Sequence, residues 1–150
     1  MRVGSALWRA CLGPVALLLL HGTEARAQFI AVSGSLTLRV STALAGAAPS
    51  ATSDASSTYF MYAPTAGTRL VAQLNTAMPS GLTLTANLST KSGISQGAVT
   101  LDTSPQSLVT GISQGFYSSS TITYRLVATL AAGVVTVQTR TVTFTLIAGP

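Results

Sequence analysis

From residue 28 onward, apolar residues alternate with threonine, serine and arginine at every second position, in short runs that end at glycine or proline. Successive side chains of a β-strand point to opposite faces, so this period predicts strands with one buried and one solvated face. The runs cover 36–40, 58–63, 68–74, 82–88, 98–101, 107–112, 121–130 and 137–147. No window carries a sustained helical stripe, and the abundant Thr and Val favour extended backbone. The chain is therefore predicted to be all-β.

The alternation also predicts which side chains face the core. The inward sets are Leu36, Leu38 and Val40; Leu82, Leu84, Ala86 and Leu88; Ile122, Tyr124, Leu126, Ala128 and Leu130; and Val142, Phe144 and Leu146. In the aromatic run at 59–62, Tyr59 and Met61 share one face and Phe60 and Tyr62 share the other. At least one aromatic side chain is thus expected to meet solvent or a partner.

Turn residues separate the runs at 64–67, 79–81, 91–97, 102–105 and 131–133. The longest interruption, 43–57, consists of small residues and is expected to be a loop or a crossover between sheets. About seven to eight short antiparallel strands with turns between them are typical of a sandwich or barrel. We expect an immunoglobulin-like Greek-key β-sandwich, and the alternative is a small β-barrel.

Residues 1–27 have the three parts of a secretory signal peptide: a basic start, an apolar run and Ala25-Arg26-Ala27 as cleavage site. The apolar run, 12–20, is shorter than the roughly 20 residues that a spanning helix needs. Cleavage before Gln28 would leave 28–150 as a single β-sandwich domain without a membrane span. The expected location is exported: periplasmic, cell-surface or extracellular.

Processing would remove the residues that most often carry chemistry. The only Cys, His, Trp and Glu are Cys11, His21, Trp8 and Glu24. Five cations remain, spread singly along the chain (Arg39, Arg69, Lys91, Arg125 and Arg140), against Asp54 and Asp102. Nucleic-acid binding needs clustered cations, and zinc needs Cys or His ligands, so we expect no nucleic-acid partner, no metal and no cofactor.

Enzymatic activity is also not expected. Without a histidine or thiolate base, the only candidate catalytic pair is Asp54 with Asp102, as in a glycosidase. Asp54 falls in the small-residue stretch, and Asp102 precedes Thr103-Ser104-Pro105, where an aspartate commonly caps a turn through the backbone. No catalytic residue is assigned.

The segment GISQG occurs twice, at 93–97 and 111–115. A repeat array needs at least three units, so two copies do not make one. If the strands between them form a hairpin, both copies lie close together at one end of the sandwich. Ser95, Gln96, Ser113 and Gln114 then form a candidate contact site, possessing hydroxyls and amides on loops. The simpler interpretation is that the glycines shape loop ends while Ile94 and Ile112 enter the core.

The stretch from Thr68 to Leu146, including TRLVAQLNTAMPSGLTLTANL and TITYRLVATLAAGVVTVQTRTVTFTL, resembles a group of small, signal-bearing bacterial β-sandwich proteins of uncharacterised role. More loosely, the chain is similar to subunits of pili and surface fibres, though it lacks the paired cysteines of many of them. The resemblance implies no activity.

Two functions from different classes remain. The first is a non-enzymatic structural or surface subunit that self-associates through exposed strand edges, with 29–32 or 139–147 as the pairing strand. The second is a monomeric periplasmic or secreted binding or adhesion module, which would use the two GISQG loops, with a weakly bound glycan or small ligand as its partner. We favour the first.

Overall fold

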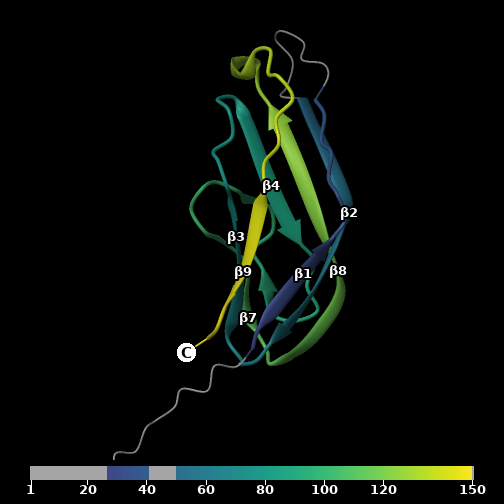
Figure 1. Ribbon diagram of the computed structural model, residues 1–150, viewed down its shortest axis with the longest axis vertical. Coiled ribbons are helices and arrows are strands. Elements are labelled where there is room, and N and C mark those ends of the chain that lie inside the picture. Colours follow the sequence, from purple (N-terminus) through teal and green to yellow (C-terminus); the bar gives the residue numbers. More distant parts are fainter. Residues whose placement is uncertain (1–26, 41–49, 150) are drawn as a thin grey trace, which may run out of the picture.

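Two antiparallel sheets form the part of the chain that the computed structural model describes, residues 27–40 and 50–149. One sheet has the strand order β1-β2-β8-β4-β6 and the other has the order β5-β7-β3-β9. The strands are β1 (Phe29–Ser33), β2 (Ser50–Ala63), β3 (Thr68–Leu74), β4 (Leu82–Leu88), β5 (Ile94–Ser95), β6 (Val99–Thr100), β7 (Gln106–Ile112), β8 (Gly115–Ala128) and β9 (Val142–Ile147). The all-β prediction is confirmed, and the sheets are arranged as in a β-sandwich (Figure 1). The strands described do not form one closed barrel, because each sheet ends in edge strands.

The core lies between the two sheets and follows the predicted alternation. In β4, Leu84, Ala86 and Leu88 are buried, and the intervening Asn87 is exposed. In β2, Tyr59 and Met61 face inward while Phe60 is exposed on the opposite face. Burying a large aliphatic side chain contributes roughly 1.5–3 kcal/mol, so this interior packing holds the fold in a chain that has a single cysteine.

Several connections pass from one sheet to the other, and tight turns make them. Thr68 is buried after the β2–β3 turn, and its hydroxyl donates to the Thr65 carbonyl oxygen at 2.7 Å. In the β3–β4 connection, Leu82 N–H donates to the Pro79 carbonyl oxygen at 3.0 Å. Both turns occur where glycine and proline predicted them.

The predicted strand at 36–40 is wrong, since the first strand is β1 and no strand covers 34–40. The β1–β2 ladder ends at the pair Ser33 and Thr58, and Gly34, with φ +104°, turns the chain away from it. Leu36 and Leu38 are nevertheless half-buried. Apolar residues at every second position indicate that one face of the segment is buried. They do not require its backbone to pair with a neighbouring strand.

The predicted loop at 43–57 is also wrong over its second half. Residues 50–57 belong to β2 and pair with β8, while 41–49 lie outside the described residues. Ladder hydrogen bonds are made by the backbone, so small side chains do not prevent pairing when a long partner strand is available.

The last predicted runs are shifted. The strand β8 begins at Gly115, six residues before the expected 121, and Leu130 lies in a short 3-10 helix, η1 (Leu130–Ala132), where it is 57% exposed instead of inside. Of the strand expected at 137–147, only Val142–Ile147 forms a strand, β9, and Val137 is fully exposed. The chain leaves the sheet after Ala128, so the alternation in 137–141 has no neighbouring strand to pair with.

Residues 1–26 of the predicted signal peptide, 1–27, lie outside the described part. Within the described part, no helix combines the length and apolar character needed to cross a membrane.

Candidate functional site

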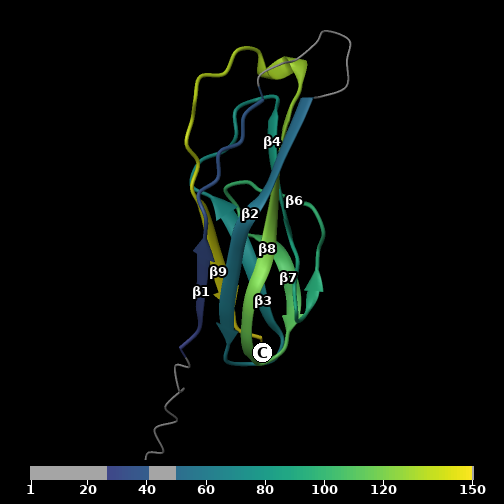
Figure 2. The same ribbon diagram turned by 90° about the vertical axis from the view of Figure 1, so that its right-hand side faces the viewer.

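The two sides of the sandwich have different edges. On one side the edge strands β5 and β6 have two residues each. On the other side lie β1, with five residues, and β9, with six. Very short edge strands offer few backbone groups for pairing, whereas β1 and β9 offer more. Figure 2 shows β1 and β9 on the same side of the molecule. Of the segments that the sequence singled out, 139–147 contains β9, and 29–32 covers all of β1 except Ser33.

The register of β9 identifies its free backbone groups. Asn75 N–H donates to the Thr141 carbonyl oxygen at 3.0 Å, so Thr141 and, by alternation, Thr143 and Thr145 direct their backbone groups toward β3. Val142, Phe144 and Leu146 direct theirs outward. The Leu146 carbonyl oxygen accepts from Gln28 Nε2 at 3.0 Å, which closes the lower end of this edge. Among the described strands, β9 pairs with β3 alone, so the outer edge is open at Val142 and Phe144.

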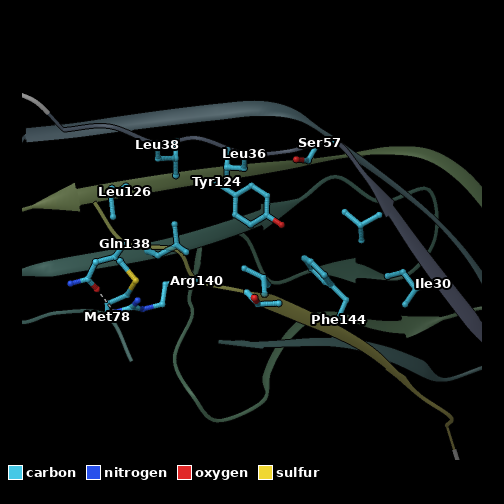
Figure 3. A pocket seen from close by; sticks show the side chains of 15 residues that line it. Ile30, Leu36, Leu38, Ser57, Met78, Tyr124, Leu126, Gln138, Arg140 and Phe144 are labelled. Atoms are coloured by element: carbon cyan, nitrogen blue, oxygen red, sulfur yellow. Dashed lines mark hydrogen bonds between the residues drawn. The ribbon is translucent and has the colours of Figure 1, made fainter. Parts of the chain in front are cut away.

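A cavity of about 560 Å³ lies between the sheets behind this open edge (Figure 3). Its wall combines aliphatic and aromatic side chains with polar groups in comparable measure. Its lining residues are Ile30, Val32, Gly34, Leu36, Leu38, Ser57, Met78, Leu84, Tyr124, Leu126, Gln138, Arg140, Thr141, Val142 and Phe144. The segment 34–40 and the segment leading into β9 cover the space without pairing as strands, which leaves it unfilled.

Tyr124 contributes a phenolic hydroxyl to the cavity wall. The residue is 4% exposed, and its hydroxyl points into the cavity in Figure 3. No hydrogen bond to this hydroxyl occurs among the described residues. Every fully sealed side-chain nitrogen or oxygen there has a partner, so this hydroxyl is open to the cavity. The Tyr124 oxygen therefore depends on the cavity for its hydrogen bonding. Burial raises the pKa of Tyr124 to about 12.

Arg140 lies at one end of the cavity with Gln138 and Met78, away from the end formed by Ile30 and Phe144 (Figure 3). Its Nε donates to the Ala77 carbonyl oxygen at 3.2 Å, and one terminal nitrogen donates to the Thr139 carbonyl oxygen at 3.0 Å. The other terminal nitrogen donates to Gln138 Oε1. All of these acceptors are neutral, so the guanidinium is held in place while its charge has no carboxylate partner among the described residues.

A second feature is a cluster of aromatic rings on the outer face of the five-stranded sheet. Phe29 of β1 meets Phe60 of β2 edge-on, with ring centroids 5.4 Å apart. Tyr62 stacks on Phe116 of β8 at 4.5 Å. Phe60 is 45% exposed, so the prediction that an aromatic side chain of the run 59–62 meets solvent is confirmed, and Phe116 is exposed as well. The rings pack on one another instead of lying side by side as a flat platform.

The two GISQG segments are neighbours, as the sequence suggested. Ile94 pairs with Thr110 and Ser95 pairs with Val109, so the first copy runs as edge strand β5 along β7. Ser113 N–H, in the second copy, donates to Ser92 Oγ at 3.0 Å. Ile112 enters the core as expected, but Ile94 is 69% exposed, because it lies on an edge strand instead of in a loop.

The four candidate contact residues do not converge on one site. Gln96 Nε2 donates to Thr110 Oγ1 at 3.1 Å, and Ser95 Oγ accepts from Gly97 N–H at 3.3 Å, so both side chains serve the local structure. Ser113 and Gln114 are exposed on the β7–β8 turn, where their carbonyl oxygens accept from the Tyr117 hydroxyl. At about 3.3 Å per residue along β7, the pair Ser95–Val109 and Ser113 are roughly 13 Å apart.

The two aspartates form local turns. Asp102 Oδ1 accepts from Ser104 N–H at 2.7 Å, which confirms its role as a turn cap. Asp54 lies in β2 at a register shift, not in a loop, and its Oδ1 accepts from Ser56 N–H at 2.8 Å and from Ser56 Oγ at 2.6 Å. These two hydrogen bonds lower the pKa of Asp54. In the described part, no three His, Cys, Asp or Glu side chains gather as metal ligands would.

Sequence reasoning missed Arg140 and the cavity. A sign was available for Arg140, because it shares the parity of Val142, Phe144 and Leu146 and is therefore a cation on the inward face of that run. The cavity itself has no sequence signature, since it arises from how two non-paired segments cover the interior.

Comparison of the chain with protein-family models, with curated protein sequences and with solved structures found no significant match. The function is therefore inferred from the geometry of the chain itself.

Proposed function

We propose that this protein is an exported, non-enzymatic structural or surface subunit that self-associates through exposed strand edges. The observation that carries the proposal is the open outer edge of β9, where Val142 and Phe144 direct backbone groups away from β3. A strand added there would satisfy these groups by β-augmentation. The uncharged sequence of Val142–Ile147 offers no electrostatic obstacle to pairing.

The position of the edge favours assembly in one direction. The opposite side of the sandwich ends in two-residue strands, which are poor templates. A contact between β9 of one copy and a different strand of the next copy would be heterologous, and such contacts build open chains when the rotation does not close. Fibres or ladders are the expected products.

We also propose the finer assignment of an immunoglobulin-like Greek key. It is supported by β8, which lies between β2 and β4 although it follows both in the chain, and by the passage of the chain between sheets after β2 and after β8. The absence of His and Cys from 28–150, together with the local engagement of both aspartates, supports a role without catalysis.

The test uses the chain from Gln28 to Pro150, exported by a bacterial host, in gel filtration and negative-stain microscopy. We expect oligomers or fibres that Val142→Pro abolishes, because proline removes an outward N–H without removing a bond to β3. Val142→Ala is the matched control: it truncates the same side chain, keeps the N–H and should assemble. A sharp monomer peak at every concentration, with no polymer, would contradict the proposal.

A further inference from the structure

We propose that the cavity behind β9 is a binding site for a single-chain amphipathic anion, whose head group pairs with Arg140 and whose apolar chain lies along Leu126, Leu36 and Phe144. This site goes beyond the assembly function, because it uses side chains inside the sandwich and not the backbone edge. The shared chemistry of the ligand is an aliphatic chain with a terminal carboxylate or phosphate.

The size of the cavity fits a small molecule, and its wall offers both apolar and polar groups. Ligand pockets typically have volumes of about 300–1,000 Å³ and mostly apolar walls with a few placed polar groups. This cavity, at about 560 Å³, lies within that range. Leu84 and Leu126 from the five-stranded sheet and Val142 and Phe144 from β9 supply apolar surface on opposite sides. An alkyl chain between them would gain the contacts that the empty space lacks.

Arg140 places a positive charge at one end of the cavity. A guanidinium has five N–H donors, and the three hydrogen bonds to Ala77, Thr139 and Gln138 leave two of them for a ligand. A carboxylate or phosphate can accept both in a bidentate pair, which is the geometry for which arginine is best suited. The same bonds fix the guanidinium in advance, so little side-chain entropy is lost on binding. A cationic ligand is disfavoured, because no acidic residue lines the cavity.

Tyr124 adds a second polar requirement in the cavity wall. Its hydroxyl has no partner among the described residues, is open to the cavity and points into it. A ligand that displaced solvent from this hydroxyl without offering an acceptor would leave the donor unsatisfied, so a ligand oxygen near it would be favoured over a plain methylene. The site is thus expected to prefer a chain that carries a hydroxyl or carbonyl oxygen along its length. Because the pKa of Tyr124 is raised to about 12, the group remains a donor at neutral pH.

The binding experiment uses the unsubstituted 28–150 chain, because Val142 itself lines the cavity. Dodecanoate, dodecyl phosphate, dodecanol and dodecyltrimethylammonium are titrated below their micelle concentrations by calorimetry. We expect the two anions to bind at least tenfold more tightly than the alcohol and the cation. The difference between dodecanoate and dodecyl phosphate then distinguishes a carboxylate head from a phosphate head. Val142→Pro, the variant expected to remain monomeric, is titrated in parallel, to show whether assembly changes access to the cavity.

Matched variants locate the head group. Arg140→Gln should weaken dodecanoate binding about tenfold or more, as expected for loss of a charge-assisted hydrogen-bond pair. Arg140→Lys keeps the charge but loses the bidentate pair, so its affinity should lie between those of the unsubstituted and Arg140→Gln proteins. Arg125→Gln is the control, because Arg125 follows Tyr124 in β8 but is exposed on the outer face. Equal affinity of the Arg140→Gln and unsubstituted proteins would overturn the proposal.

A second comparison tests Tyr124. Among monohydroxy dodecanoates with the hydroxyl at successive positions, one position should bind several-fold more tightly than dodecanoate, and Tyr124→Phe should abolish that advantage while leaving dodecanoate binding unchanged. The methyl resonances of Leu36, Leu84 and Leu126, which line the cavity, should shift on binding, and those of the exposed Ile94 should not. Anion binding that shifts only surface residues would also overturn the proposal. Assembly is scored separately by gel filtration of the unsubstituted chain, so failure of either function can be recognised alone.

Discussion

Gly81 holds the turn between β3 and β4 in a backbone conformation, φ +79°, that favours glycine. Its surroundings add a second constraint, because a Cβ at this position would lie 2.2 Å from the Ala132 backbone nitrogen. The Gly81 carbonyl oxygen also accepts from Thr129 N–H at 2.9 Å. One residue thus joins the β3–β4 turn to the end of β8.

We predict that Gly81→Ala lowers the free energy of unfolding by about 3 kcal/mol or more, from the left-handed conformation and the backbone clash together. Gly97→Ala is the matched control: Gly97 has φ +73°, but no atom lies within 4 Å of its added Cβ. Its cost should be about 1–2 kcal/mol. Urea unfolding measures both values, and equal losses would show that the clash is relieved.

Tyr124 should make stability depend on alkaline pH. Its folded-state pKa, about 12, is higher than the ordinary value of 10.0, so the folded protein holds this proton more tightly than the unfolded chain. The resulting stabilisation is complete below pH 10 and is lost as the pH rises through about 12. Burial also raises the pKa of Tyr59, which acts in the same direction. Thermal unfolding between pH 9 and 12 should therefore show a shallower decline in stability for Tyr124→Phe than for the unsubstituted chain. Identical slopes would contradict this prediction.

At the scale of elements, β1 is held by few interactions besides its ladder. It is an edge strand that pairs only with β2 in the described sheet, and Phe29 attaches it to the aromatic cluster through Phe60, Tyr62 and Phe116. On its other face, Ile30 packs against the margin of the core, and both Ile30 and Val32 line the cavity. The outer aromatic contacts therefore matter more for β1 than for a central strand.

Phe29→Ala should loosen β1 without unfolding the protein. An aromatic pair contributes about 0.5–1.5 kcal/mol beyond its buried area, so hydrogen exchange of the β1 amides should accelerate roughly 3- to 10-fold. The amides of β4, which is not in contact with the cluster, serve as the internal control. Unchanged exchange in β1 would mean that its ladder with β2 is sufficient.

At the scale of the whole molecule, most pairings join distant parts of the chain. Ser50 pairs with Ala128, and Arg69 pairs with Ile147. Closing such loops costs entropy before the contacts form, and all-β sandwiches accordingly fold slowly. We predict single-domain folding in milliseconds to seconds by stopped-flow fluorescence of tyrosine, and microsecond folding would indicate that local hairpins dominate instead.

The sequence alone determined the all-β class, the bounds of β3 and β4 and most inward-facing residues, because a period of two follows directly from strand geometry. It also placed Asp102 at its turn, where the contacts are local. The strand at 50–57, the unpaired state of 36–40 and the exposure of Leu130 depended on which segments meet in space. For the same reason only the tertiary structure decided the open edge of β9, the charge of Arg140 beside the cavity and the free hydroxyl of Tyr124.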